Sequence, residues 1–333
     1  TTKKILRRNI EKYNLCTKNT STLRNIRYAF EAEHKIDNNL LREIWLDTNK
    51  QSSLLWKEVS GKTEDRKQYL SNEYSEDRGL WDNEKKEAID QLNKYGIYIL
   101  KKRVDKSMVG SIRRALIEKT TKPSNHKQEI LNIPKRGGDV IDDLESNYVR
   151  WHYEANVFSE IDELKMIAED HSLRGIAKEY LGSCPISVNK QAWISKGIKN
   201  QCLAQSSSAA QLYHFDYDSF NFLKVMVYLS DVKENCGPHT YMKTSHKPFT
   251  NEITMRQISK YGRYQDEFIY SLFGKENEIS VTGKEGTIIL VDTSGFHKGR
   301  ILEEGRTRIM AQVEFVDCGL QFGHNHPRKE KNK

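Results

Sequence analysis

Hydrophobic residues recur at helical spacing in the second quarter of the chain. Ala88, Ile89 and Leu92 fall on one face if residues 84–95 form a helix, and the glycine that follows suits the C-terminal end of that helix. The same reasoning predicts two further helices, over residues 105–116 and 152–181. Residues 120–148 contain prolines and paired glycines, so we predict an irregular segment there.

In the second half of the chain the pattern changes to short apolar runs that are typical of β-strands. Turn signals such as Gly237-Pro238 and Glu304-Gly305 separate these runs. The predicted strands cover residues 97–100, 186–195, 211–216, 223–229, 287–292 and 308–315. Helices early, strands late and no regular βαβ alternation predict an α+β fold with a mainly β, sandwich-like core.

The ends of the chain differ from its middle in charge. The net charge is +8, but residues 1–30 alone carry +7 and residues 324–333 carry +3. We predict a basic, mostly helical N-terminal extension over residues 1–80, a main domain over 81–323 and a basic tail over 324–333. The extension suits contact with an anionic surface, and the alternative that the residues leave open is a solvated extension without a partner. Its charges are scarcely interleaved with aromatic residues, so no nucleic-acid groove is indicated.

The composition is that of a water-soluble protein. Only 37% of the 333 residues are hydrophobic, and no apolar run approaches the roughly 18–20 residues that a membrane span needs. The first residues lack the apolar stretch of a secretory signal. The five cysteines include no CxxC pair, which is typical of reduced thiols. We therefore expect a cytoplasmic protein.

The chemical signal of greatest interest is a His-x-Asp pair. His214 and Asp216 are two residues apart, so on a β-strand their side chains point to the same side of the sheet. His297, which follows another predicted strand, supplies a second imidazole. Two histidines and one carboxylate on one face leave three positions of a metal ion open, an arrangement typical of non-haem Fe(II) oxygenases. We predict that these three residues are the metal ligands and form the catalytic centre.

Each candidate ligand also has a simpler interpretation. A single histidine is more often a surface or core residue than a ligand, and His-x-Asp tripeptides occur by chance. The context favours a metal site, because His214 and Asp216 end one predicted strand and His297 comes just after another. Zinc or manganese at the same three donors is the alternative that the residues leave open.

An arginine near the C-terminal end of the main domain suits a second function at the same site. On the strand 308–315, Arg308, Met310 and Gln312 point one way, and the more apolar set between them points the other way. A guanidinium facing the metal is able to hold a carboxylate by two parallel hydrogen bonds. Arg306 has the same parity, so the alternation alone does not choose between the two arginines.

Several motifs together resemble the phytanoyl-CoA dioxygenase family. The resemblance covers roughly residues 83–320 and includes the helix near 84–95 with its glycine stop. The motifs are His214-Phe215-Asp216, Asp231-Val232, Gly237-Pro238-His239, Ser245-His246-Lys247, Gly286, His297 and Arg308. The chain departs from the family pattern at Lys243-Thr244, where the family often has Pro-Gly.

The resemblance implies a double-stranded β-helix (jelly-roll) core that uses Fe(II), 2-oxoglutarate and O₂. In this family the arginine that binds 2-oxoglutarate lies eleven residues after the distal histidine, so the resemblance implies this role for Arg308 rather than Arg306. Family members that halogenate have a small residue at the position of Asp216, so its presence favours hydroxylation or desaturation. The predicted reaction hydroxylates an unactivated C–H bond of a small-molecule or conjugated metabolite and releases succinate and CO₂.

The neighbouring strands contain further candidates for binding. Lys224 and Tyr228 share one face of the strand after the His-x-Asp pair, and either is able to help hold the far carboxylate of 2-oxoglutarate. Gln211 is a third candidate for the co-substrate pocket, and Asn221 and Trp193 are candidates for substrate contact. The alternative of another class is a jelly-roll binding protein without turnover, for which a disrupted set of ligands is expected.

Overall fold

The computed structural model describes residues 79–123, 135–142, 147–182, 185–219, 221–249, 258 and 262–316, with the backbone alone at Val188. Almost all of the predicted N-terminal extension, and the whole of the predicted basic tail, lie outside the described residues. Among the described helices, none combines the length and the hydrophobicity that crossing a membrane requires.

The helices lie mainly before the strands that carry the site, as the sequence predicts. The first long helix, α6, ends at Gly96, whose φ of 81° is left-handed and whose N–H donates to the carbonyl of Leu92 at 2.8 Å. The helices are η1 (Asp82–Glu84), α6 (Lys85–Tyr95), α7 (Lys106–Glu118), α8 (Gly137–Asp142), α9 (Val157–Glu160), α10 (Asp162–Glu169), α11 (His171–Leu181), α12 (Leu203–Ser208), α14 (Asp266–Phe273) and η2 (Lys275–Asn277).

Within the described residues, one antiparallel sheet has eight strands in the order β1-β9-β6-β11-β5-β4-β2-β3, and a smaller one has the order β10-β7-β8. The strands of the large sheet are β1 (Ile97–Ile99), β2 (Thr120–Pro123), β3 (Lys135–Arg136), β4 (Arg150–Tyr153), β5 (Ile186–Lys196), β6 (Phe222–Tyr228), β9 (Ile288–Val291) and β11 (Thr307–Val316). Those of the small sheet are β7 (His239–Met242), β8 (Glu278–Val281) and β10 (His297–Gly299).

Three predictions of secondary structure were wrong in part. The helix predicted over 152–181 begins only after β4, and it is divided into α9, α10 and α11. Burial alternates along β4, which is the signature of a strand but too short to stand out beside the helical pattern that follows. The segment predicted to be irregular contains β2, β3 and α8, and the strand predicted over 211–216 pairs only through single bridges.

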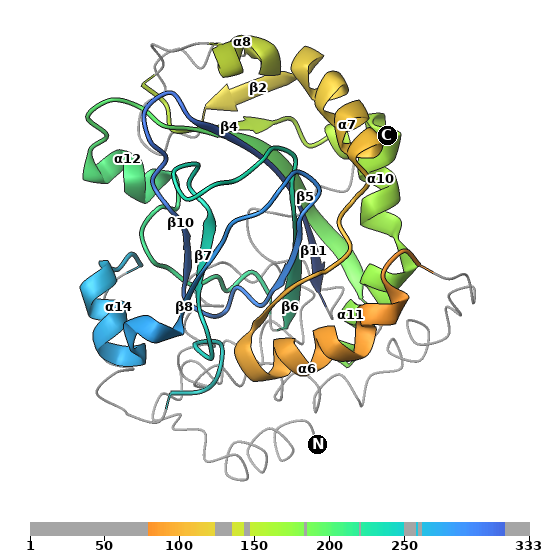
Figure 1. Cartoon of the computed structure of the whole chain (residues 1–333), viewed down its shortest axis with the longest axis vertical. Coiled ribbons are helices and arrows are strands. Elements are labelled where there is room, and N and C mark those ends of the chain that lie inside the picture. Colours follow the sequence, from red (N-terminus) through yellow and green to blue (C-terminus); the bar gives the residue numbers. More distant parts are fainter. Residues whose placement is uncertain are drawn as a thin grey trace, which may run out of the picture.

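The two faces of the large sheet have different neighbours. Helices α6, α7, α10 and α11 lie on one side of this sheet, and the small sheet lies on the other side (Figure 1). Side chains such as Val225, Leu290 and Val313 belong to the hydrophobic core under the helices. Side chains of the opposite parity, such as Met226, Ile289 and Met310, pack in a second core with residues of the small sheet. The fold is therefore α+β with a mainly β core of two sheets, as the sequence predicts.

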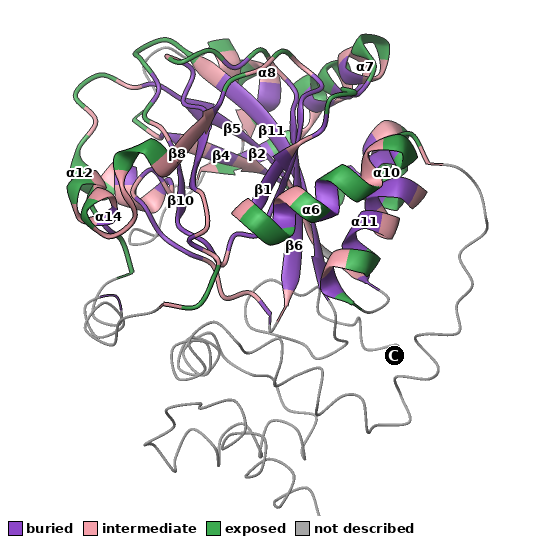
Figure 2. Ribbon diagram, turned by 60° about the horizontal axis from the view of Figure 1, so that its bottom comes forward, coloured by how far each residue is buried: buried purple, intermediate pink, exposed green. Residues whose placement is uncertain are grey.

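Burial follows this layered arrangement. Figure 2 shows that the central strands are buried along their length, whereas α6 has a buried side and an exposed side. A third apolar cluster joins α14 to the small sheet through Phe296, Met242 and Tyr213. The small sheet is thus held between this cluster and the core that it shares with the large sheet, and its position relative to β6 and β11 is fixed by packing on both faces.

Candidate metal centre and cavity

Backbone pairing brings the two predicted histidine ligands together. The N–H of His214 donates to the carbonyl of His297 at 3.0 Å, and the N–H of His297 donates back to His214 at 2.8 Å. This antiparallel bridge leaves the ring centroids 4.3 Å apart. The N–H of Asp216 donates to the carbonyl of Thr293 at 2.7 Å, which holds the aspartate beside the same turn. One donor atom from each of these three residues lies within 4.8 Å of the others.

Both imidazole rings are oriented by the backbone two residues before them. Nδ1 of His214 lies 2.9 Å from the carbonyl of Leu212, and Nδ1 of His297 lies 3.0 Å from the carbonyl of Gly295. A carbonyl only accepts hydrogen bonds, so each Nδ1 carries the proton and each Nε2 presents a lone pair. Such backbone contacts fix the tautomer and the orientation of metal-binding histidines. Burial, together with the nearby His297 and Arg263, lowers the pKa of His214 well below its usual value, which keeps this imidazole neutral.

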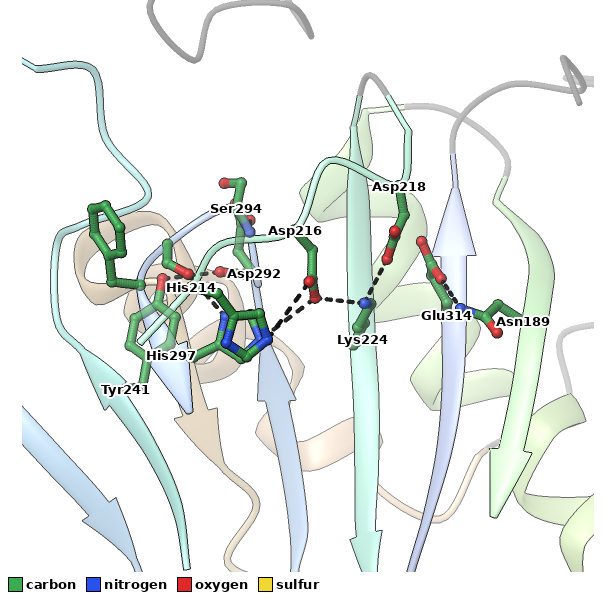
Figure 3. Close-up of polar contacts among 12 residues, drawn as sticks. Asn189, His214, Asp216, Asp218, Lys224, Tyr241, Asp292, Ser294, His297 and Glu314 are labelled. Atoms are coloured by element: carbon green, nitrogen blue, oxygen red, sulfur yellow. Dashed lines mark hydrogen bonds and ion pairs between the residues drawn. The ribbon is translucent and has the colours of Figure 1, made fainter. Parts of the chain in front are cut away.

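The carboxylate of Asp216 faces both histidines and a lysine (Figure 3). Its Oδ1 lies 3.9 Å from Nε2 of His214, and its Oδ2 lies 3.4 Å from Nε2 of His297. Nζ of Lys224 donates to Oδ2 of Asp216 at 2.7 Å and to Oδ2 of Asp218 at 2.6 Å. Burial favours the neutral carboxyl, but the Lys224 ammonium outweighs it, and the pKa of Asp216 lies well below its usual value. The aspartate is therefore an anionic ligand at neutral pH.

The three candidate ligands line a cavity of about 770 Å³. The inward-facing residues of the large sheet form its wall, in rows that run across neighbouring strands. One row contains Arg150, Ser195 and Arg308, on β4, β5 and β11, and the adjacent row contains His152 and Trp193. All of these except Ser195 line the cavity. The volume is within the range of small-molecule sites.

Arg308 is buried in this wall without an acidic partner. Its side chain is 2% exposed, its Nη1 donates to the carbonyl of Gly237, and its Nη2 donates to Oγ of Ser195 at 3.3 Å. Nε has no hydrogen-bond partner, and no carboxylate among the described residues pairs with the guanidinium. A buried guanidinium without a counter-charge is costly, which indicates an anionic ligand. Arg306 is exposed in the preceding turn and does not line the cavity.

The other predicted binding residues lie in different places. Trp193 lines the cavity, and its indole Nε1 has no partner. Tyr228 is buried outside the cavity lining, where its hydroxyl donates to the carbonyl of Val281 at 2.7 Å. Gln211 also lies outside the lining and accepts a hydrogen bond from Gln201. Asn221 likewise lies outside it and donates to the carbonyl of Leu181 at 3.2 Å. The structure thus brings Trp193 to the metal ligands and Arg308, but not these last three residues.

Lys224 also lines the cavity, but its ammonium already bridges two aspartates. The opposing charges of Asp216 and Asp218 raise the pKa of Lys224 well above its usual value despite the effect of burial. Behind it, Glu314 is 1% exposed and accepts a hydrogen bond from Asn189 at 2.8 Å. These residues form a line of polar groups across β6, β11 and β5 (Figure 3).

Sequence reasoning missed four basic residues of the cavity, one of which is His152 on β4. His239, the last residue of the Gly237-Pro238-His239 motif, is buried beside His297, with ring centroids 5.7 Å apart and no partner at Nε2. Arg150 lies on β4, between the segment predicted as irregular over 120–148 and the helix predicted over 152–181, so no element was predicted there and nothing indicated where its side chain points. Arg263 reaches the cavity from a loop before α14, where no periodicity predicts direction.

The residues present fit a metal ion and an anionic co-substrate. Two neutral imidazoles and a carboxylate are a donor set that binds Fe(II). The unpartnered donors of Arg308 and Trp193 and the unpartnered Nε2 of His239 face the same cavity, although buried polar groups normally have partners. The arrangement is able to bind a metal ion on the small-sheet side and an anion on the large-sheet side.

Comparison with known proteins gives matches in structure only. No protein-family model matches the chain, and no curated protein is similar to it in sequence. One match is EctD from S. alaskensis with 2-oxoglutarate and 5-hydroxyectoine, at 14% identity and a TM-score of 0.49, over 76% of this chain and 81% of that one. Another is the epimerase SnoN from nogalamycin biosynthesis with Fe³⁺ and α-ketoglutarate, at 14% identity and a TM-score of 0.46, over 71% and 84%.

HygX from Streptomyces hygroscopicus, with nickel, 2-oxoglutarate and hygromycin B bound, also matches. Its identity is 13% and its TM-score is 0.46, over 70% of this chain and 87% of that one. All three proteins have been solved with 2-oxoglutarate (α-ketoglutarate) bound, and they differ in the other molecules that they bind.

Proposed function

We propose that this protein is an Fe(II)- and 2-oxoglutarate-dependent dioxygenase that hydroxylates a C–H bond of a small molecule. The observation that carries the proposal is one cavity containing both halves of such a site. His214, Asp216 and His297 present their donor atoms within 4.8 Å of one another, and Arg308 is buried in the same wall without an acidic partner. A metal site alone fits many proteins, but a metal site with a buried, unpaired guanidinium fits one that binds an anionic co-substrate beside the metal.

Each residue has a defined role in the proposed reaction. The imidazoles and Asp216 hold the metal, and Lys224 holds the Asp216 carboxylate in place. Arg308 binds the carboxylate of 2-oxoglutarate remote from its keto group. Bound Fe(II) supplies the activation of O₂, and the overall reaction takes substrate, 2-oxoglutarate and O₂ to hydroxylated substrate, succinate and CO₂. The walls of the cavity exclude water and orient the C–H bond.

The proposal also covers the protein family, the boundaries of the domain and the location of the protein. Two sheets face to face, a His-x-Asp pair and Arg308 eleven residues after the distal histidine support a double-stranded β-helix of the phytanoyl-CoA dioxygenase type. We propose that this domain covers residues 81–323 of a cytoplasmic protein, between a basic extension over 1–80 and a basic tail over 324–333. The basic extension supports contact with an anionic surface.

The test is uncoupled turnover of 2-oxoglutarate. Protein is loaded with Fe(II) without oxygen, 2-oxoglutarate is added, O₂ is admitted, and succinate is measured. The proposal predicts succinate from the wild type and none from Asp216→Ala. Where the loaded wild type forms no succinate, titration with 2-oxoglutarate decides: binding indicates dependence on the missing substrate, and no binding contradicts the proposal in favour of a binding protein. Retention of zinc or manganese in preference to iron indicates a different metalloenzyme.

A further inference from the structure

The cavity contains two arginines that the metal and the co-substrate do not use. Arg150 lies in the same cross-strand row as Arg308, with Ser195 between them in the register of β4, β5 and β11. Arg263 reaches the cavity from the loop before α14. Arg150 comes from the large sheet and Arg263 from the side of the small sheet, so their guanidinium groups approach the same space from different walls.

Neither arginine has an acidic partner among the residues that the structure describes. The guanidinium of Arg150 lies 5.2 Å from the centre of the Trp193 ring, and its Nε has no hydrogen-bond partner. Nε1 of Trp193, in the same wall, is also unpartnered. A cation–π contact contributes about 0.5–2 kcal/mol, which is less than the cost of removing an unpaired guanidinium from water. Two adjacent donors without acceptors therefore indicate a ligand that brings its own oxygen atoms.

Repulsion between the arginines adds to this cost. Burial, followed by the positive charges of Arg308 and Arg263, lowers the pKa of Arg150 to about 9. Partial removal from water also lowers the pKa of Arg263, although this residue keeps more contact with solvent than Arg150 does. Like charges held close together raise the free energy of the empty cavity, and an anion bound between them lowers it. The three arginines therefore create a positive electrostatic potential that attracts anions into the cavity.

The charges of the cavity indicate that the substrate, as well as the co-substrate, is anionic. Among the described residues that line the cavity, cationic side chains outnumber carboxylates by two. They are Arg150, Lys224, Arg263 and Arg308, against Asp216 and Asp218. A divalent metal ion and the dianion 2-oxoglutarate cancel each other, so this excess of two positive charges persists when both are bound. The excess resides on Arg150 and Arg263, because Lys224 is paired and Arg308 is taken by 2-oxoglutarate.

We propose that Arg150 and Arg263 bind an anionic group of the organic substrate, a phosphate or a carboxylate, with Trp193 donating to the same group. This inference rests on the proposed function in one respect, because Arg308 is assigned to 2-oxoglutarate. The substrate is thus an anionic metabolite, held by its charged end at these residues while the C–H bond to be oxidised extends toward His214 and Asp216. Uncharged molecules are therefore expected to be poor substrates.

The experiment is calorimetric titration of Co(II)-loaded protein that is already saturated with 2-oxoglutarate. The probes are inorganic phosphate and acetate, each at constant ionic strength, so that the better probe identifies the kind of anion. We expect saturable binding of one probe to the wild type and a dissociation constant about tenfold higher, or more, in Arg150→Gln and in Arg263→Gln. Arg306→Gln removes an exposed arginine outside the cavity, and we expect this matched control to bind the probe as the wild type does.

The outcomes distinguish this inference from the proposed function. Binding of neither probe, or equal binding by the wild type and both cavity variants, overturns the inference. Displacement of 2-oxoglutarate by the probe, with weaker 2-oxoglutarate binding in Arg150→Gln, also overturns it, because Arg150 then belongs to the co-substrate site. Failure of the wild type to bind 2-oxoglutarate at all overturns the proposed function instead. Arg263 is exposed, so Arg263→Gln tests the inference even where Arg150→Gln does not fold.

Discussion

Lys224 and Asp216 form an ion pair that connects the two sheets at the metal centre. Nζ of Lys224, on β6 of the large sheet, lies 2.7 Å from Oδ2 of Asp216, which follows the histidine bridged to β10. The same ammonium lies 2.6 Å from Asp218, and the side chain of Lys224 is only 6% exposed. The lysine therefore fixes the aspartate on the side away from the histidines and balances a second, partly buried carboxylate (Figure 3).

Replacing Lys224 with methionine is expected to destabilise the metal-free protein by about 3–5 kcal/mol, because two carboxylates lose their buried counter-charge. Urea unfolding in the presence of a chelator measures this loss. In the double variant Lys224→Met/Asp218→Asn one of the two carboxylates is neutral, so part of the stability is expected to return. Additive effects of the two substitutions contradict the coupling that the distances indicate.

Removing a metal ligand is expected to abolish high-affinity iron binding. Asp216→Ala and His297→Ala each leave two of the three donors. Anaerobic titration with Fe(II), followed by gel filtration and iron analysis, measures the bound metal. Asp218→Asn is the matched control, because this carboxylate is bonded to Lys224 but lies outside the donor cluster, and it is expected to retain the metal. Stoichiometric iron in Asp216→Ala would show that the ligands have been misassigned.

Arg306 and Arg308, which have the same parity in the sequence, are expected to differ in their contribution to the binding of 2-oxoglutarate. Arg308→Ala removes charge-assisted hydrogen bonds worth about 1.5–3 kcal/mol, so the dissociation constant for 2-oxoglutarate should rise about tenfold to a hundredfold. Quenching of tryptophan fluorescence in the metal-loaded protein measures the constant. Arg306→Ala is the control, since its side chain is exposed outside the cavity. Equal effects of both substitutions contradict the assignment of Arg308.

Glu314 is expected to make stability depend on pH. Burial, reinforced by the negative charge of Asp218, raises the pKa of this carboxyl to about 8, from an ordinary value of 4.5. The folded protein thus holds a proton that the unfolded chain has lost. Its stability falls as pH rises from about 4.5 to about 8, by at most about 1.4 kcal/mol for each pH unit.

In Glu314→Gln this dependence is absent, so the variant should gain stability relative to the wild type between pH 5 and pH 8, with no further gain above about pH 8. Urea unfolding of the metal-free proteins at several pH values measures the difference. The substitution Glu304→Gln, at an exposed position, is the control and should follow the wild type. If the free energy of unfolding of Glu314→Gln differs from that of the wild type by the same amount at all pH values, the pKa of the Glu314 carboxyl is not raised.

Much of the domain followed from local pattern. The alternation along β11 predicts that Arg308 and Met310 share a face opposite to Val313, and the structure confirms this division between the cavity side and the helix-covered core. The helical spacing before Gly96 likewise predicts α6 and its end. Prediction failed at β4, because four residues of alternation followed by helices give too little signal to distinguish a strand.

The sequence by itself determined the helices, the alternation of the long strands and the His-x-Asp pair, because each depends on residues that are close in the chain. The alternation did not choose between Arg306 and Arg308, and the family spacing favoured Arg308, which the structure places in the cavity. Only the tertiary structure decided that Arg150 and Arg263 join Arg308 there. The spacing of residues fixes the direction of a side chain relative to its own element. The register between distant strands, and the loop that brings Arg263 to them, depend on how the two sheets pack against each other.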